Sequence, residues 1–383
     1  MKGKLFSEAP NGKKYPLPDN ARDEKEREII AKFVDDQKKL GRQIVVVQGL
    51  GFVGAVMAAV VADAKNSPFF VIGCQRPSTR SFWKIPVINS GLAPVKSNNL
   101  EIEQIFARCV RHKQTFHATW LNDAFKYADV VIVDIQLDAI KPELGKADRA
   151  YCDLKAFQDG IREIGRHIPF QALVLIETTV PVGACQKIAK PIIEEEFQKR
   201  GADLNITPPR IVHSYERVMP GPKFVWSIRN YPRVFAGIDN ASARMADKFL
   251  SRVIQAPLTE LNDTNASEAA KLMENLKRAA DIALANQLAI VCEKCGINYF
   301  TICEAIKQRR GTHDNMCKPS LGVGGYCLTK DPVLLKFGAQ KLLGLTDLDF
   351  TFATGVVNIN DLMPCHTFEL IQKGLNNNME GKK

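Results

Sequence analysis

Short runs of apolar residues recur through the first part of the chain, each followed by polar or glycine-containing residues. They cover residues 43–48, 69–74, 129–133, 172–177 and 211–214. An unbroken apolar run of this length is typical of a strand that is buried on both faces, as in a parallel sheet flanked by helices. The sequence therefore predicts an α/β fold with a Rossmann-like, doubly wound parallel sheet.

The hydrophobic pattern changes near residue 266. Residues 267–290 contain neither proline nor glycine and predict one long helix, and residues 350–374 predict a last helix. Near the start, Asn20 is a candidate cap for a helix with one narrow apolar stripe, formed by Ile29, Ile30, Phe33 and Val34. We expect four parts: an N-terminal extension (1–40), a Rossmann-like domain built on the parallel sheet (41–262), a helical central domain (263–375) and a tail (376–383).

Composition narrows the class of protein. Of 383 residues, 45% are hydrophobic and 25% are charged, as in ordinary soluble globular proteins, and no apolar run is long enough to span a membrane. The first residues lack the apolar core of a secretory signal, and ten scattered cysteines indicate reduced thiols and a cytoplasmic location. Cys292-x-x-Cys295 has no second ligand pair, so we expect no metal site. The net charge of +10 fits a phosphorylated ligand or an ordinary charged surface. The sequence contains no basic run interleaved with aromatic residues, so we expect no nucleic-acid partner.

A glycine-rich turn follows the first strand and precedes a helix of small residues. Its sequence is Gly49-Leu50-Gly51-Phe52-Val53-Gly54. In this context Gly49 suits a tight turn, Gly51 lets the backbone approach a pyrophosphate, and Gly54 lets the helix pack closely on the strand. The pattern predicts dinucleotide binding through these residues, and the alternative is a purely structural turn.

The residues after the second strand leave the choice of dinucleotide open. An acidic residue is expected there, because it holds the hydroxyls of the adenosine ribose. This chain has Gln75 and Arg76 instead. Arg76 would pair with the 2′-phosphate of NADP. Equally, Gln75 would bind the ribose of NAD while Arg76 stacks on the adenine, so we expect NAD, with NADP as the alternative.

A cysteine follows a second glycine-rich stretch, near the end of the chain. Gly322, Gly324 and Gly325 let backbone N–H groups approach an oxyanion or a phosphate. Cys327 would be open to attack a substrate there, and Lys330, three residues further on, favours its thiolate. Taken by itself, the stretch is more often a glycine-rich turn before a helix.

Other polar residues end strands or share a helix face. Thr179 follows a strand at the carboxyl edge of the sheet, where ligands bind in such folds, although it could equally cap a helix. Glu216 also follows a strand, as a surface charge or a general base. Glu268, Lys271 and Asn275 fall on one face of the long helix, which is usually the solvated face.

Together these motifs resemble the UDP-glucose/GDP-mannose dehydrogenase family, the nucleotide-sugar 6-dehydrogenases. Five blocks stand in the family's order over about residues 43 to 375: 49–54, 177–183, 216–221, 268–275 and 322–332. Residues 88–94 match more weakly. Because the block around Cys327 is distinctive and all five occur in order, the resemblance outweighs the structural interpretation of each block alone.

The resemblance implies an enzyme that oxidises the C6 alcohol of a UDP-sugar to the uronic acid in two hydride transfers, for polysaccharide or glycan precursor synthesis. Cys327 matches the nucleophile that forms a thiohemiacetal and then a thioester. Lys271 and Asn275 match the pair that polarises the C6 oxygen or orients a water, and Asp331 matches the acid that assists this water. The resemblance also implies binding residues around the reacting carbon (Glu216, Thr179), at the cofactor (Thr179, Lys330) and at the substrate (Glu216, Arg217, Lys271, Asn275, Gly322, Gly324, Gly325).

The chain also departs from the family. Residues 134–138 lack the Thr-Pro turn that often lines the cofactor site. Typical members carry a C-terminal nucleotide-binding domain of ~100 residues, which we do not find in this sequence. We therefore keep two alternatives, a dehydrogenase of a smaller alcohol and a non-catalytic cofactor-binding relative that serves as a partner protein. The sequence does not decide which sugar the UDP-sugar substrate contains. We also expect the protein to form a homodimer through its last helix.

Overall fold

A computed structural model describes residues 5–377, which form two compact units. The first comprises the chain up to Leu137 together with Leu154–Thr178 and Gly183–Glu268. The second comprises Asp138–Asp153, Thr179–Val182 and the chain from Ala269 on. The domain bounds expected from the sequence, with a boundary at residue 262, stay a prediction beside this division into compact units. Of the tail proposed for 376–383, residues 378–383 lie outside the described part.

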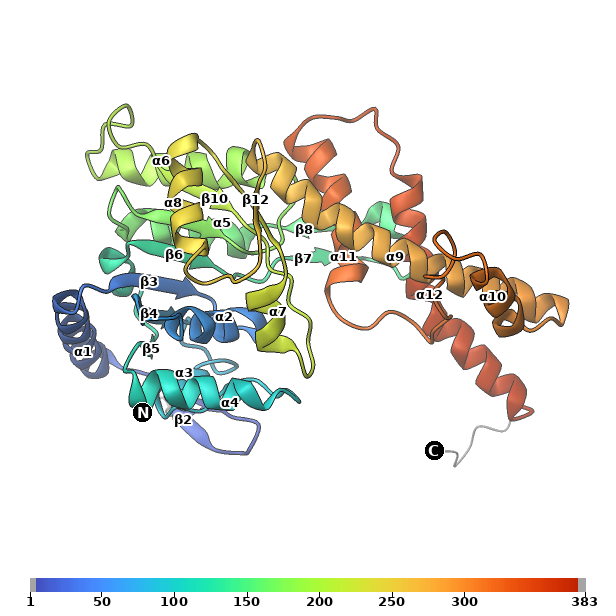
Figure 1. Ribbon diagram of the computed structural model, residues 1–383, viewed down its shortest axis with the longest axis horizontal. Helices are drawn as coiled ribbons and strands as arrows, with labels where there is room; N and C mark the ends of the chain where they lie inside the picture. Colours follow the sequence, from blue (N-terminus) through green and yellow to red (C-terminus); the bar gives the residue numbers. More distant parts are fainter. Residues whose placement is uncertain (1–4, 378–383) are drawn as a thin grey trace. The chain divides into compact units, whose positions relative to one another are not determined.

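The first unit is built on one eight-stranded sheet (Figure 1). In spatial order the strands are β12 (Leu258–Glu260), β11 (Arg233–Gly237), β10 (Arg210–His213), β9 (Leu173–Ile176), β6 (Val130–Val133), β3 (Gln43–Gln48), β4 (Phe69–Cys74) and β5 (Phe116–Thr119). Neighbouring strands are parallel except β10 and β11, which are antiparallel. Because the sheet starts at β3 in its middle and grows outwards on both sides, the predicted doubly wound α/β fold is confirmed.

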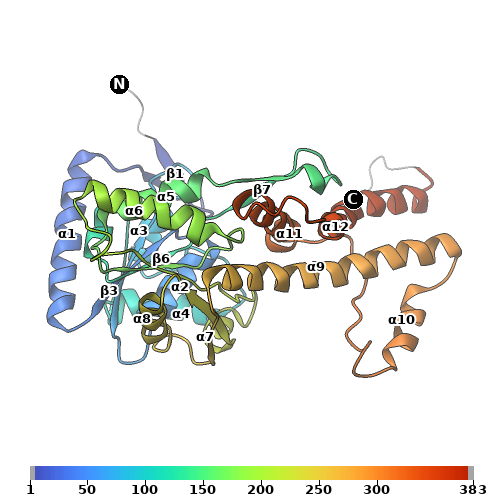
Figure 2. The ribbon, with the colours of Figure 1, turned by 90° about the horizontal axis from the view of Figure 1, so that it is seen from above.

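Helices cover both faces of this sheet. They are α1 (Asn20–Lys39), α2 (Phe52–Ala62), α3 (Lys84–Asn89), α4 (Leu100–Ala107), α5 (Lys155–His167), α6 (Lys190–Lys199), α7 (Phe224–Asn230) and α8 (Asn240–Leu250). Side chains of α2, α4, α7 and α8 share one apolar core with residues of the strands. Figure 2 shows α5 and α6 together on the other side of the sheet. The central strands are therefore buried on both faces, which explains their unbroken apolar sequences.

One local prediction was wrong, and one hairpin was missed. A 3₁₀-helix over Asn122–Tyr127 precedes β6. Helix α1 is capped by Asp19, whose carboxylate accepts a hydrogen bond from the N–H of Arg22 at 3.1 Å, and Asn20 is its first helical residue. The missed element is an N-terminal hairpin of β1 (Phe6–Glu8) and β2 (Lys14–Pro16), whose strands are too short to show a period.

The second unit is helical apart from one hairpin, β7 (Asp138–Ile140) and β8 (Tyr151–Asp153). Its helices are α9 (Thr264–Cys295), whose first turn belongs to the first unit, α10 (Tyr299–Lys307), α11 (Cys327–Phe337) and α12 (Thr351–Gly374). Shorter helical turns lie at Ala147–Arg149 and Gly338–Leu342 in this unit, and at Arg108–His112 and Cys185–Ala189 in the first unit.

Buried amides join the long helices of this second unit. Asn360 of α12 donates to the carbonyl of Ala279 in α9 at 3.0 Å and accepts from Asn286 at 3.0 Å. Lys141, after β7, pairs with Asp361 of α12 at 2.5 Å. Within residues 5–377, no helix is both long enough and apolar enough to cross a membrane.

Candidate active site

The glycine-rich turn after β3 has the geometry of an anion cradle. Gly49 has φ +99°, and a Cβ there would lie 2.4 Å from the carbonyl oxygen of Asp134. A Cβ on Gly54 would lie 2.0 Å from the carbonyl of Gly49, so α2 packs directly on the turn. Nothing lies within 4 Å of a Cβ at Gly51, which caps α2 without a side-chain hydrogen bond. The unpaired N–H groups of the first turn of α2 are therefore open to a pyrophosphate.

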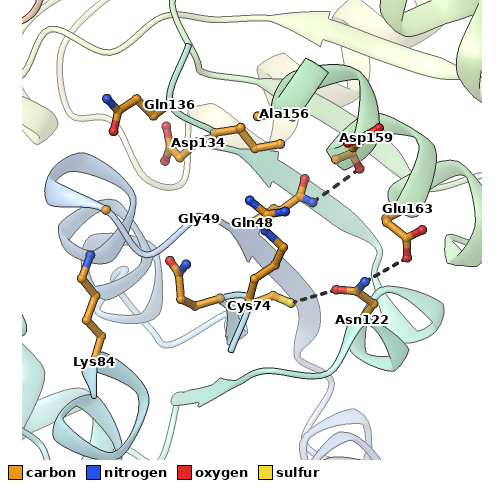
Figure 3. A pocket seen from close by; sticks show the side chains of 15 residues that line it. Gln48, Gly49, Cys74, Lys84, Asn122, Asp134, Gln136, Ala156, Asp159 and Glu163 are labelled. Atoms are coloured by element: carbon orange, nitrogen blue, oxygen red, sulfur yellow. Dashed lines mark hydrogen bonds between the residues drawn. The ribbon is translucent and has the colours of Figure 1, made fainter. Parts of the chain in front are cut away.

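A cavity of about 370 Å³ opens beside this turn, at the carboxyl ends of β3, β4 and β6 (Figure 3). Its lining comprises Gln48, Gly49, Gly51, Cys74, Gln75, Arg76, Lys84, Asn122, Asp134, Ile135, Gln136, Ala156, Asp159, Gly160 and Glu163. Four predicted cofactor residues belong to this lining: Gly49, Gly51, Gln75 and Arg76. Gly54 packs behind the turn, and Phe52 contacts Phe224 with ring centroids 4.8 Å apart. Like Phe52 and Gly54, Val53 is not part of the lining.

Two side chains hold the peptide groups of Leu50 inside the turn. Gln75 accepts the N–H of Leu50 through Oε1 at 2.9 Å, and its Nε2 donates to Ser81 at 3.3 Å. Lys84 donates from Nζ to the carbonyl of Leu50 at 2.9 Å, and burial lowers the pKa of this lysine. The amide of Gln75 is thus already used to shape the turn. The sequence could not show this, because the partner lies 25 residues away.

Arg76, the residue after Gln75, differs from it in having no hydrogen-bond partner for its side chain among the described residues. Its side chain is exposed, lines the cavity and forms no hydrogen bond or ion pair with any described residue. An unpaired guanidinium at the end of the second strand suits a phosphate or an adenine ring equally well. The two alternatives drawn from the sequence therefore remain for this residue.

Asp134 is a cavity residue that the sequence did not single out. It follows β6, and its Oδ2 is buried without a hydrogen-bond partner among residues 5–377. Burial, reinforced by the charge of Glu216, raises the pKa of Asp134 to about 8, against the opposing charge of Arg233. At neutral pH the carboxyl group is therefore mostly protonated and does not repel a pyrophosphate. Its place at a strand end, like that of Glu177, was the available signal.

We expect Asp134→Asn to stabilise the protein more at about pH 8 than at about pH 5. The folded chain keeps this proton until about pH 8, whereas an unfolded aspartate releases it near pH 4. Between these values the unfolded state binds fewer protons, so wild-type stability falls as the pH rises. Urea unfolding of both proteins at the two pH values measures the difference; an effect of equal size at both would contradict the assignment.

A buried ion pair joins the strands next to Asp134. Arg233, at the start of β11, contacts Glu177, which follows β9, and donates to Ser214, which follows β10, at 3.0 Å. The side chains of Arg233 and Glu177 are 2% and 0% exposed. Burial lowers the pKa of Arg233 to about 10, with the charge of Asp134 acting in the opposite direction. This pair fixes the ends of three adjacent strands at the edge of the sheet.

Glu216 and Arg217 belong to the turn that follows β10. The carboxylate of Glu216 accepts the N–H of Val218 and lies near enough to Asp134 to raise the pKa of that residue. Arg217 donates to the carbonyl of Pro232 at 2.8 Å and to the hydroxyl of Tyr215 at 3.1 Å. Both side chains are partly exposed.

The predicted nucleophile lies at the beginning of a helix in the second unit. Cys327 is the first residue of α11, is exposed and is not in a disulfide. Before it, Gly322 (φ +148°) and Gly325 (φ +90°) adopt conformations that residues with a Cβ rarely take. A Cβ at Gly324 would meet nothing within 4 Å. The first turn of α11 therefore offers backbone N–H groups beside an accessible thiol.

Asp331 binds two other predicted site residues of this unit, Asn275 and Lys330. Its carboxylate is 0% exposed and accepts from Asn275 at 2.5 Å and from Lys330 at 2.9 Å. Cys327 and Asp331 are one turn apart on α11, as Lys271 and Asn275 are on α9, and residues four apart share a helix face. The Asn275–Asp331 bond therefore brings the face of Lys271 towards the face of Cys327. Lys330, predicted at the cofactor, is paired with Asp331 here.

Thr179 does not cap a helix. It lies in an extended segment before helical turns that begin at Ala184, and it forms no hydrogen bond through its side chain with any described residue. The capping role belongs to Glu268, whose carboxylate accepts the N–H groups of Gly183 and Cys185, at 2.6 and 2.8 Å. Burial raises the pKa of Glu268 to about 7. Glu268 is therefore a structural residue, although it precedes Lys271 by one helical turn.

The fold and the glycine-rich turn define a dinucleotide-binding protein. Residues 43–254 match the NAD binding domain of the UDP-glucose/GDP-mannose dehydrogenase family, and residues 265–361 match its central domain. The chain belongs to this family and is an NAD-dependent oxidoreductase.

Similar proteins and solved structures support this membership. UDP-N-acetyl-D-mannosamine dehydrogenase of Pyrococcus horikoshii is 30% identical over 338 residues, which is 86% of this chain and 71% of that protein. The crystal structure of NDP-N-acetyl-D-galactosaminuronic acid dehydrogenase from Methanosarcina mazei Go1 is 30% identical, with a TM-score of 0.72 over 92% of this chain and 72% of that one. The structure of UDP-D-ManNAc dehydrogenase from Pyrococcus horikoshii is 27% identical, with a TM-score of 0.73 over 87% and 72% of the two chains.

Proposed function

We propose that this protein oxidises the C6 alcohol of a UDP-sugar to the uronic acid with NAD, through a covalent adduct on Cys327. One observation carries the proposal: the exposed Cys327 at the head of α11 shares a helix face with the Asp331 that Asn275 binds at 2.5 Å. A thiol that traps an aldehyde is needed when one carbon loses four electrons and the intermediate must not escape.

The proposed chemistry has four steps. First, the C6 alcohol gives a hydride to NAD⁺ and a proton to the site, which leaves an aldehyde. The sulfur of Cys327 then adds to the aldehyde carbon and forms a thiohemiacetal. The thiohemiacetal then gives a second hydride to a second NAD⁺ and its hydroxyl proton to the site, which leaves a thioester. Finally, water adds to the thioester and the C–S bond breaks, which releases the acid and restores the thiol.

The other site residues have roles in these steps. The ammonium of Lys271 stabilises the negative charge that develops on the C6 oxygen, and Asn275 orients that oxygen or a water. Asp331, buried and bound to Asn275, assists the water that hydrolyses the thioester. Thr179, Glu216 and Arg217 supply polar groups to the sugar. Because they have no side chains, Gly322, Gly324 and Gly325 leave room for the sugar beside the thiol of Cys327.

For the sugar, we propose a UDP-N-acetylhexosamine, with the N-acetylmannosamine derivative as the first candidate. Support comes from the relatives, several of which are UDP-N-acetyl-D-mannosamine dehydrogenases. The product of such a reaction is a precursor for polysaccharide or glycan synthesis. A cytoplasmic location fits this role, and none of the ten cysteines is in a disulfide.

A stoichiometric assay tests the proposal. The protein is incubated with NAD⁺ and, in turn, the UDP derivatives of N-acetylmannosamine, N-acetylglucosamine, N-acetylgalactosamine and glucose. Absorbance measures NADH, and mass spectrometry measures the acid. With one of the four UDP-sugars, we expect two molecules of NADH for each molecule of acid. One NADH for each molecule of a smaller alcohol would favour the first alternative, and no NADH with any alcohol would favour a non-catalytic partner protein.

The unpaired guanidinium of Arg76 gives a prediction for cofactor choice. We expect Arg76→Ala to lower kcat/KM for NADP by about tenfold or more, since a charged hydrogen bond to the 2′-phosphate is lost. The value for NAD should change little. Arg80→Ala is the matched control, because Arg80 lies outside the cavity lining. Equal losses with both dinucleotides would instead support stacking of Arg76 on the adenine.

We also propose that the protein is a homodimer through α12. Five large apolar side chains of this helix are exposed: Phe352, Leu362, Phe368, Leu370 and Ile371. Soluble monomers rarely leave so many on one element, and a second copy is the simplest cover.

We expect the double variant Phe368→Glu, Ile371→Glu to be monomeric by light scattering after gel filtration. These residues are 52% and 47% exposed and lie on one face, three residues apart, so carboxylates there would repel across a symmetric interface. Leu100→Glu is the control, since Leu100 is 81% exposed in the first unit. A monomeric wild type, or a dimeric double variant, would contradict the interface.

A further inference from the structure

The first unit has a second cavity, larger than the dinucleotide pocket. Its volume is about 970 Å³, and its walls come from the N-terminal hairpin and from residues 83–103 of α3, α4 and their connection. In Figure 1, β2 lies beside α3 and α4. The hairpin precedes the part of the chain that matches the family's NAD binding domain, which begins at residue 43. One wall is therefore built from residues outside that domain.

The chemistry of the lining is both basic and aromatic. Lys13 and Lys96 are exposed at the cavity, and neither forms an ion pair with any residue in the range 5–377. Its one acidic residue, Glu103, already accepts the N–H of Ala93 at 3.2 Å. Tyr15 and Trp83 are partly buried in the walls and provide flat surfaces, and the ammonium of Lys13 lies over the Tyr15 ring, 5.2 Å from its centroid.

A buried amide adds a hydrogen-bonding group. Asn99 is only 8% exposed and lines the cavity; its Nδ2 donates to the carbonyl of Pro222. Its Oδ1 is buried and has no donor among the residues that the structure describes. A buried acceptor without a donor is unfavourable, because it has lost its hydrogen bond to water. A ligand that presents an N–H or O–H group would supply this donor if Asn99 turned its Oδ1 into the cavity and gave up its bond to Pro222.

We propose that this cavity binds a nucleotide. Its phosphate would lie against Lys13 and Lys96, which are well placed to neutralise it. Its planar base would contact Tyr15 and Trp83, and its donor groups would satisfy Asn99. The volume lies in the range of small-molecule sites, roughly 300–1,000 Å³.

A short chain of contacts connects this cavity to the dinucleotide turn. Ser7 in β1 accepts the N–H of Trp83 at 3.1 Å. The next residue, Lys84, donates to the carbonyl of Leu50 in the glycine-rich turn at 2.9 Å. A ligand that shifts Trp83 would therefore also shift Lys84, the lysine that holds the carbonyl of Leu50 in the glycine-rich turn. The cavity is thus an effector site, and occupancy changes the affinity for the dinucleotide. This inference concerns the NAD-binding unit and does not depend on the identity of the sugar.

Calorimetry on the full chain tests the site. The protein is first saturated with NADH, so that its adenosine pocket is filled, and is then titrated with AMP, with UMP and with inorganic phosphate. We expect binding of at least one nucleotide that is tighter than that of phosphate. The double variant Lys13→Gln, Lys96→Gln should weaken it by about tenfold or more. The control is Lys25→Gln, Lys32→Gln, two exposed lysines of α1 outside the lining.

Two optical measurements locate the ligand and its effect. Nucleotide binding should quench tryptophan fluorescence, and Trp83→Phe should abolish most of the quench while binding measured by heat persists. The dissociation constant of NADH should change by about fivefold or more when the nucleotide is present, in the wild type and not in the Lys13, Lys96 variant. The proposal is overturned if NADH-saturated protein binds neither nucleotide, binds phosphate equally well, or binds unchanged after both lysines are replaced.

Discussion

Cys327→Ser should abolish formation of the uronic acid and leave NADH binding intact. A hydroxyl at the head of α11 cannot form the thioester on which the second hydride transfer depends, so acid production should fall by at least about a thousandfold. The dinucleotide pocket lies in the other unit and does not contain Cys327, so NADH titration should give an unchanged dissociation constant. Mass spectrometry of the product and fluorescence titration of NADH measure the two quantities.

Two exposed cysteines of the second unit serve as controls. Cys295 ends α9 and Cys365 lies in α12, and neither belongs to the glycine-rich block. Their serine variants should keep wild-type turnover. If Cys327→Ser kept it as well, Cys327 would not be the nucleophile, and the covalent route would have to be abandoned.

The second large effect is on stability. Arg233→Met should destabilise the fold by about 3–5 kcal/mol, because it leaves the carboxylate of Glu177 buried without its cationic partner. Asp134 would also lose the charge that opposes the rise of its pKa. Equilibrium unfolding in urea measures the loss, and a value below about 1 kcal/mol would show that the pair is not essential.

Matched variants distinguish the effect of losing the Arg233–Glu177 ion pair from the effect of leaving the Glu177 carboxylate buried without a partner. The double variant Arg233→Met, Glu177→Leu removes both charges, so it should recover much of the stability that the single variant loses. Lys277→Met breaks the exposed Lys277–Asp281 pair, whose lysine is 66% exposed, and should alter stability by no more than about 1 kcal/mol. A double variant as unstable as Arg233→Met would point to lost packing instead.

Local sequence patterns predicted the parts of the fold that depend on neighbouring residues. The buried strands β3 and β4 and the long helix α9 follow from apolar runs and from the absence of breakers. The family resemblance added the order of the motifs and, with it, the interpretation of Cys327. Neither source could supply pairings across the sheet. The contact of Gln75 with Leu50 and that of Arg233 with Glu177 join residues 25 and 56 positions apart.

The sequence also could not show which carboxyl groups are buried and protonated. Glu268 looked like a polar residue on a helix face, yet it is buried and caps the turn at Gly183 and Cys185. Asp134 looked like a departure from the family turn, yet burial makes it a mostly neutral carboxyl beside the cradle. Both outcomes depend on how much water the fold excludes from one side chain, and that quantity has no local signature.

The hydrogen bonds of Gln75 and Lys84 to the peptide groups of Leu50 affect how the dinucleotide is recognised. Both the donor and the acceptor of the Leu50 residue are already engaged by side chains of the same rigid unit. The turn therefore does not have to give up conformational freedom when a ligand arrives, and fixing a residue takes about 1–2 kcal/mol of entropy. That entropy is spent once, during folding, and the cradle meets each incoming dinucleotide in a pre-organised shape.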